Sequence, residues 1–208
     1  GTLADTAGDL VGAVNHLRVQ RGLAPLPLET LRPYASAGAR GLIGAALDIH
    51  PGHAEFEDLR TAFLDTYERI LADTTVLFDG MAELLATLEA QGIAWGVVTN
   101  KAARFTDPLT QAIPLFATAS AVVSGDTTPH AKPHPAPLLE AAARLRVAPE
   151  HCIYVGDDER DIVAGLAAGM GTVAATYGYL GAKTDPSEWG AHAAIKSPGE
   201  LLQLLVSA

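Results

Sequence analysis

The sequence predicts an α/β protein with a parallel sheet, helices on both faces of that sheet, and an inserted all-helical block. From about residue 80 onwards, short apolar runs alternate with segments in which apolar residues recur at helical spacing. This alternation is typical of parallel sheets covered by helices. Residues 8–75 show only the helical spacing, so this part of the chain is expected to form a separate bundle of helices.

The helices are inferred from apolar stripes and from glycines that follow them. The helical block carries one stripe from Leu10 to Leu17 and a second from Phe56 to Ile70, with shorter helices expected at Leu28–Tyr34 and Gly38–Leu47. Beyond residue 80, a helix starts near Met81 and ends at Gly92. Further helices are expected at 104–112, 135–145, 159–168 and 198–206.

The strands are inferred from continuous apolar runs, which indicate burial on both faces of a sheet. They are expected at Ile93–Val98, Ala121–Val123, Cys152–Val155, Thr172–Ala175 and Ala193–Ile195. Parallel sheets of this kind bind ligands outside the carboxyl ends of their strands. Polar residues that directly follow a strand are therefore the candidates for a functional site.

Composition excludes several classes of partner. The chain of 208 residues is 49% hydrophobic and carries a formal net charge of −10, which disfavours binding to nucleic acids or to anionic membranes. A single cysteine, Cys152, excludes a disulfide within the chain. No apolar run approaches the length of a membrane span and no signal peptide is visible, so we expect a cytoplasmic protein.

The segment from Gly156 to Asp161 is the strongest candidate site, because Asp157 directly follows a predicted strand. Asp157 and Asp161 are four residues apart, so a helix beginning here would place both carboxylates on one face. Magnesium prefers such oxygen ligands and keeps waters and phosphate oxygens as the others. Alternatively, the aspartates only cap the helix N-terminus.

Two other polar positions complete the predicted phosphate site. Thr99 and Asn100 follow the strand that ends at Val98, where a hydroxyl and free backbone N–H groups can hold a phosphoryl oxygen. Lys132 lies in a rigid Lys-Pro-His-Pro segment and can neutralise a phosphate. In the helical block, Arg40 is a basic residue in a stretch of small residues and could reach a substrate anion. Taken singly, each of these residues is as well explained as a helix cap or a solvated charge.

Together, these motifs and the opening Gly1-Thr2-Leu3-Ala4-Asp5 give the chain a clear resemblance to haloacid dehalogenase-superfamily phosphatases of the phosphoglycolate phosphatase-like group. The resemblance implies a Rossmann-like core (residues 1–7 and 76–208) and a helical cap (residues 8–75). It also implies that Gly1 and Thr2 end an Asp-x-Asp-Gly-Thr motif. We therefore expect upstream residues that hold the first strand, the nucleophilic aspartate and the acid/base aspartate; without them the chain would not turn over.

The resemblance further implies a magnesium-dependent phosphatase that hydrolyses a small phosphomonoester, such as 2-phosphoglycolate, through an aspartyl-phosphate. Thr99 and Lys132 would be catalytic, Gly1, Thr2, Asn100 and Arg40 would contact the substrate, and Asp157 and Asp161 would hold Mg²⁺. The segments Trp95–Lys101 and Tyr177–Tyr179 also resemble N-acetylmuramic acid 6-phosphate phosphatases, which leaves that substrate open. An inactive phosphate-binding or regulatory module remains the alternative of another class, and the protein is expected to be a monomer or a homodimer.

Overall fold

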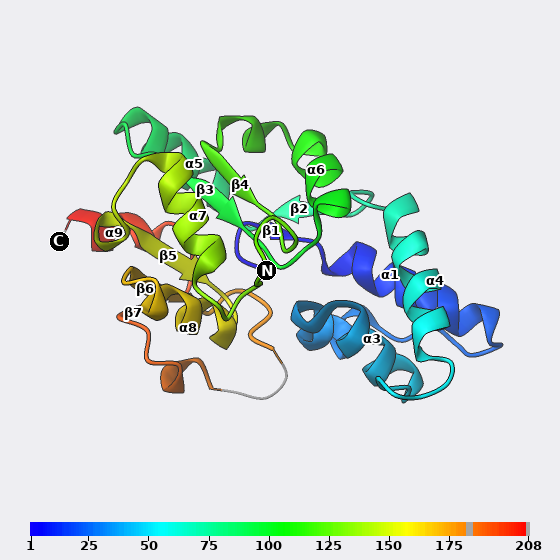
Figure 1. The fold of residues 1–208 in the computed structure, drawn as a ribbon. Helices are drawn as coiled ribbons and strands as arrows, with labels where there is room; N and C mark the ends of the chain where they lie inside the picture. Colours follow the sequence, from blue (N-terminus) through cyan, green and yellow to red (C-terminus); the bar gives the residue numbers. More distant parts are fainter. Residues whose placement is uncertain (182–184, 207–208) are drawn as a thin grey trace.

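The computed structural model describes residues 1–181 and 185–206. The chain begins with the short strand β1 (Ala4–Asp5) and enters a group of helices before it returns through β2 (Val76–Leu77). The helices are α1 (Ala7–Gln20), α2 (Leu28–Leu31), the 3-10 helix η1 (Arg32–Ala37), α3 (Gly38–Leu47) and α4 (Phe56–Arg69). We call these helices the cap, and they lie together at one end of the molecule (Figure 1).

We call the remainder of the chain the core. The two chain segments that connect the cap to the core lie side by side. β1 and β2 pair antiparallel, with Ala4 opposite Leu77 and Asp5 opposite Val76. The chain therefore leaves and re-enters the core through two adjacent strands. Inside the cap, α1, α3 and α4 pack around fully buried residues that include Val14, Leu42 and Phe63.

The core contains the remaining elements, in which strands alternate with helices. These are α5 (Met81–Ala90), β3 (Gly96–Val98), α6 (Ala103–Ala112), β4 (Ala121–Val123), α7 (Ala136–Leu145), β5 (Ile153–Gly156), α8 (Glu159–Ala167), β6 (Gly171–Ala175), β7 (Ala193–Ile195) and α9 (Glu200–Val206). Three short 3-10 helices, at Pro114–Thr118, Pro149–His151 and Pro186–Glu188, lie in the connections. β3 pairs parallel with β4, and β5, β6 and β7 form a second parallel ladder.

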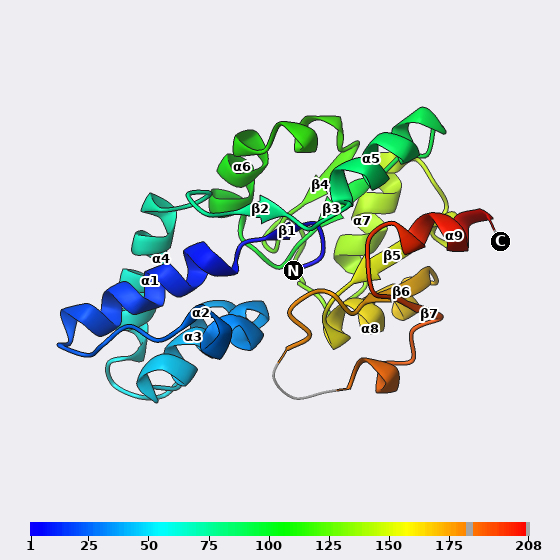
Figure 2. The ribbon, with the colours of Figure 1, turned by 180° about the vertical axis from the view of Figure 1, so that it is seen from behind.

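Helices cover both faces of these strands. On one face, Leu138 of α7 and Ala164 of α8 belong to a buried cluster that also contacts Val98 and Tyr154. On the other face, Leu85 of α5 and Leu201 of α9 pack with Trp95, Val173 and Ile195. Figure 1 shows the molecule from the side of α7. Figure 2 shows it from the opposite side, where α5 and α9 lie in front.

The predicted fold class is confirmed: an α/β core with parallel strands, helices on both faces and an inserted group of helices. The expected helix at Leu28–Tyr34 differs, because α2 ends at Leu31 and the chain continues as a 3-10 helix through Pro33. A proline has no N–H to donate and so disfavours continuation of an α-helix.

The expected strand at Ile93–Val98 is also shorter than predicted. Only Gly96–Val98 forms β3, and its residues are partly exposed rather than buried. The reason is that β3 pairs with β4 along one edge, while its other edge faces a cavity across from β5. Within the described ranges, no helix combines the length and the apolar character needed to cross a membrane.

Candidate active site

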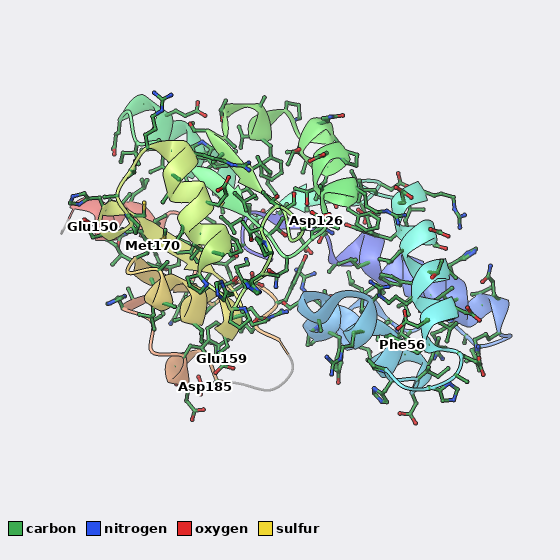
Figure 3. All side chains as sticks on the ribbon, in the orientation of Figure 1. Phe56, Asp126, Glu150, Glu159, Met170 and Asp185 are labelled. Carbon is green, nitrogen blue, oxygen red and sulfur yellow. The ribbon has the colours of Figure 1, made fainter. Side chains whose placement is uncertain are left out.

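A cavity of about 490 Å³ lies between β3 and β5 and opens where these strands end. Its lining includes apolar side chains of both strands and, at the carboxyl ends, Thr2, Thr99, Lys132, Asp157 and Asp161. Four segments that are far apart in the sequence therefore meet at one place. Figure 3 labels Glu159, the first residue of α8, on the core side of this region, and Phe56, the first residue of α4, within the cap.

Lys132 is held by three partners. Its Nζ lies 2.8 Å from Oδ1 of Asp161, and it donates to the Tyr154 hydroxyl at 2.7 Å and to the Val98 carbonyl at 3.0 Å. Burial alone would lower the pKa of Lys132, but Tyr154 and Asp161 outweigh it and the net shift of the pKa is upward. The ammonium therefore stays charged at neutral pH and has a fixed position in the cavity wall.

Asp157 lies at the end of β5 and is 5% exposed. Its Oδ1 accepts a hydrogen bond from the Thr2 hydroxyl at 2.8 Å, and its Oδ2 accepts one from the Tyr179 amide at 3.0 Å. Two glycines permit this packing, since a Cβ at Gly1 or at Gly178 would collide with the Asp157 side chain. The carboxylate is thereby clamped between the N-terminal segment and the loop after β6.

Asp161 has a different environment from Asp157. The helix begins only at Glu159, with Asp158 as an extended N-cap, so Asp157 precedes the helix. The expectation that one helix face presents both carboxylates is therefore wrong. Oδ2 of Asp161 accepts from the amides of Asp157 and Asp158 at 3.1 and 3.2 Å, and Oδ1 pairs with Lys132.

The cavity offers one carboxylate that suits a magnesium ion. Each carboxylate oxygen can accept two hydrogen bonds or ligand contacts, and among the described residues each oxygen of Asp157 accepts one hydrogen bond. Magnesium takes one or two protein carboxylates and completes its shell with water and phosphate oxygens. Across the described part of the chain, no group of three or more His, Cys, Asp or Glu residues could hold a metal alone. Asp157 fits the role of a protein ligand, because it faces no cationic side chain and each of its oxygens can take a further contact. In Asp161, Oδ2 is filled by two amides and Oδ1 is directed at the Lys132 ammonium.

Thr99 and Asn100 follow β3, but their side chains do different things. Thr99 lines the cavity, and its hydroxyl oxygen accepts a hydrogen bond from the Lys101 amide at 3.1 Å. The Asn100 side chain accepts from the Lys132 amide at 3.0 Å and donates to the Lys132 carbonyl at 2.9 Å. Asn100 therefore ties the loop after β3 to the segment that carries Lys132.

The structure does not bring Arg40 into this arrangement. Arg40 lies in the first turn of α3, is exposed, and is not among the described residues that line the cavity. Its proposed contact with a substrate anion stays a prediction.

Two tyrosines that the sequence analysis did not assign to the site are part of it. Tyr154 donates its hydroxyl to the Val98 carbonyl at 3.1 Å and accepts from Lys132. Tyr179 contacts Asp157 through its amide, while its hydroxyl accepts from the Thr6 amide at 2.7 Å and donates to Asp5 at 3.0 Å. A signal for Tyr154 existed, because a tyrosine within an otherwise apolar strand needs a partner for its hydroxyl.

Comparisons with known proteins agree with this fold. A family model for haloacid dehalogenase-like hydrolases matches residues 1–175. An N-acetylmuramic acid 6-phosphate phosphatase of Pseudomonas putida is 39% identical over 208 residues, which are 100% of this chain and 93% of that protein. A phosphoglycolate phosphatase of Xanthomonas campestris pv. campestris is 41% identical over 201 residues, covering 97% of this chain and 90% of that protein.

Among solved structures, the chain is similar to a crystal structure described as a predicted phosphoglycolate phosphatase from Haemophilus somnus. The TM-score is 0.85 with 26% sequence identity, and the match covers 99% of this chain and 94% of that chain. The similarity therefore extends over the core and the helices inserted into it.

Proposed function

This chain belongs to the haloacid dehalogenase-like hydrolase family, and we propose that it is a magnesium-dependent phosphatase of small phosphomonoesters of the 2-phosphoglycolate type. The observation that carries the proposal is the meeting of Thr99, Lys132 and Asp157 at the mouth of one cavity. A hydroxyl, a permanent cation and a metal-binding carboxylate are the groups that phosphoryl transfer requires. The names of the relatives from Pseudomonas and Xanthomonas support the same class of reaction.

In this proposal the side chains of the cavity bind and orient the phosphoryl group. Lys132 neutralises charge on the phosphoryl oxygens, and Asp161 and Tyr154 keep its ammonium in place. The Thr99 hydroxyl, together with backbone N–H groups of Gly1 and Thr2, donates to the transferred group. Asn100 acts through its hydrogen bonds to the Lys132 backbone.

Asp157 would hold the magnesium ion beside the phosphoryl group. When bound, the ion supplies positive charge next to the phosphate oxygens. The Thr2 hydroxyl and the Tyr179 amide fix the orientation of the Asp157 carboxylate.

In this proposal, hydrolysis proceeds through an aspartyl-phosphate. An aspartate carboxylate attacks phosphorus and displaces the leaving oxygen, which a second carboxylic acid protonates; the resulting carboxylate then takes a proton from the water that attacks the aspartyl-phosphate and releases phosphate.

A second candidate substrate is N-acetylmuramic acid 6-phosphate. It is favoured by the Pseudomonas putida relative, whose similarity extends over the full length of this chain at 39% identity. The reaction and the catalytic groups would be the same, and only the leaving group would differ.

The test is phosphate release by the intact protein from 2-phosphoglycolate and from N-acetylmuramate 6-phosphate, with Mg²⁺ and with a chelator. We expect turnover of at least one ester in Mg²⁺ and its loss in the chelator. Asp157→Asn should abolish release, while Asp107→Asn, an exposed carboxylate on α6, serves as the matched control and should leave it unchanged. Release that is equal in the chelator, or the absence of release from every ester, would contradict the proposal; the latter favours a binding module.

A further inference from the structure

Lys101 is a cation at the boundary between core and cap that has no carboxylate partner within the described ranges. It follows Thr99 and Asn100 in the loop after β3 and lines the same cavity. Its backbone is anchored, because its amide donates to the Thr99 hydroxyl and its carbonyl accepts from the Gly125 amide at 2.8 Å. The side chain therefore extends from the loop that is proposed to hold the phosphoryl group.

The cap holds the ammonium of Lys101. Its Nζ donates to the Tyr67 hydroxyl of α4 at 2.6 Å and lies 4.3 Å from the centroid of the same ring. Tyr67 is 2% exposed and packs against Phe63 and Phe105. One of the three N–H donors is thus directed at Tyr67, and two remain for another acceptor.

Other partly buried cations near the cavity are paired with carboxylates, which makes Lys101 different. Lys132 is paired with Asp161, and Arg32 is paired with Asp5. Among the ion pairs of the described residues, none involves Lys101. A partly buried ammonium without a counterion is costly unless a ligand supplies the negative charge.

Asp9 is the carboxylate whose charge acts on Lys101, but its oxygens are occupied. Oδ1 of Asp9 accepts from the amide and the hydroxyl of Thr74, and Oδ2 accepts from the Ala72 amide and the Thr75 hydroxyl. Burial lowers the pKa of Lys101 to about 8, and Asp9 only partly opposes this shift. Asp9 joins α1 to the segment after α4, so among the described residues Lys101 has no carboxylate that contacts it directly.

We propose that Lys101 binds a carboxylate on the leaving group of the substrate, so that the protein selects phosphomonoesters that carry a second, singly charged anionic group. The proposal rests on the proposed phosphatase function, in which the phosphoryl group lies at Thr99, Lys132 and Asp157. The leaving group then faces the cap, where Lys101 presents two free N–H donors. A single ammonium matches the charge of a carboxylate, whereas a second phosphate dianion would leave negative charge uncompensated in a partly buried site.

Both candidate substrates satisfy this requirement. 2-Phosphoglycolate carries a carboxylate on a two-carbon leaving group, and N-acetylmuramate 6-phosphate carries one on its lactyl ether. The two candidates therefore share a carboxylate on the leaving group, and the protein should hydrolyse esters that lack this carboxylate less efficiently.

The test compares matched pairs of esters in steady-state phosphate release by the intact protein with Mg²⁺. One pair is 2-phosphoglycolate and ethyl phosphate; the other is N-acetylmuramate 6-phosphate and N-acetylglucosamine 6-phosphate, which lacks the lactyl carboxylate. Lys101→Met should lower kcat/KM for the carboxylate-bearing ester of the hydrolysed pair by roughly 10- to 100-fold, the range of a charge-assisted hydrogen bond. The partner ester should change by less than about threefold. Lys196→Met, which removes an exposed lysine outside this cavity, is the matched control and should alter neither ester.

The outcomes separate this inference from the function on which it rests. An equal fall for both esters of a pair, or no change for either, overturns the role of Lys101 while phosphatase activity stands. If no ester is hydrolysed, the proposed function fails, and thermal shifts with 2-phosphoglycolate and ethyl phosphate decide the inference. The role of Lys101 is supported if 2-phosphoglycolate raises the melting temperature more than ethyl phosphate does and if this difference disappears in Lys101→Met. It is refuted if the two esters raise the melting temperature of the unsubstituted protein equally.

Discussion

Nζ of Lys132 lies 2.8 Å from Oδ1 of Asp161, and each of these two side chains is only 9% exposed. Removing one member of a buried ion pair leaves the other charge uncompensated, at a cost of about 3–5 kcal/mol. Lys132→Met should therefore lower the free energy of unfolding by about that amount. The double variant Lys132→Met/Asp161→Asn should regain a large part of it, since an asparagine oxygen can still accept from the helix amides.

Urea denaturation of the single and double variants measures this prediction, and phosphate release separates stability from catalysis. Activity should stay at background in both variants, because the ammonium is lost in each. A double variant as unstable as Lys132→Met would show that the ion pair is not the cause of the loss.

Gly178 leaves no room for a side chain beside Asp157, and its replacement should disturb that carboxylate. A Cβ at this position would collide with Cβ of Asp157, and such overpacking typically costs about 1–3 kcal/mol. Gly178→Ala should lower the free energy of unfolding by this amount and reduce kcat with 2-phosphoglycolate. Gly199→Ala is the control: a Cβ there meets open space, and its effect should stay within about 0.5 kcal/mol. Equal effects of the two substitutions in urea denaturation would refute the packing argument.

The ion pair between Arg32 of η1 and Asp5 of β1 joins cap and core and should weaken in acid. Burial is the largest single influence and would raise the pKa of Asp5, but the hydrogen bonds from Arg32, the Ala7 amide and Tyr179, together with the charge of Arg32, outweigh it and lower the pKa below its usual value. For a carboxylate with a lowered pKa, the stabilisation is present above the unfolded value near 3.8 and is lost as pH falls through the folded value.

A double-mutant cycle with Arg32→Met and Asp5→Asn tests this pair. The coupling free energy at pH 7 should be about 1 kcal/mol and should decrease below the usual pKa of an aspartate. A coupling that is independent of pH would mean that Arg32 contributes through packing on Tyr179, whose ring centroid lies 5.4 Å from Cζ of Arg32.

Lys101 should destabilise the unliganded protein. Burial lowers its pKa from 10.5 to about 8, so folding favours its neutral form. The cost of keeping Lys101 charged in the folded protein is fully present below pH 8 and disappears as pH rises towards 10.5. The difference between the folded and unfolded pKa values corresponds to a cost on the order of 3 kcal/mol at pH 7. After allowing for the lost hydrogen bond to Tyr67, Lys101→Met should raise the free energy of unfolding at pH 7 by about 1–2 kcal/mol.

Urea denaturation at pH 7 and about pH 10, where the penalty falls to roughly 1 kcal/mol, measures this effect. Asp9 on α1 and Tyr67 on α4 are the titratable neighbours that act on Lys101, and Tyr67→Phe is the control for the lost hydrogen bond. A destabilised Lys101→Met at both pH values would indicate that the lysine is satisfied in the unliganded protein.

The positions of most elements could be predicted because they depend on local patterns. Gly38–Leu47, Ala121–Val123 and Ala193–Ile195 have the predicted bounds, since helical spacing of apolar residues marks the first and short continuous apolar runs mark the other two. The extent of β3 was overestimated. An apolar run shows that a segment is suited to a buried strand, but its neighbours decide which residues pair.

That Thr99, Lys132 and Asp157 lie at one place was predictable from the sequence, but the contacts that hold them were not. Asp157 and Thr99 stand directly after strands, so the topology of a parallel sheet is enough to predict that they lie close together. The partner of Asp161 was not predictable in this way. The four-residue spacing to Asp157 would place both carboxylates on one face only within a single helix, and α8 starts at Glu159.

The sequence by itself determined the fold class, the family and the order of the motifs at the ends of the strands, because periodicity and short motifs are local properties of the chain. Only the tertiary structure decided that Lys132 is paired with Asp161, that Tyr154 supports it, and that Lys101 reaches Tyr67 of the cap with no counterion among the described residues. These contacts join residues separated by 22 to 34 positions. They follow from how helices and strands pack, which no local pattern encodes.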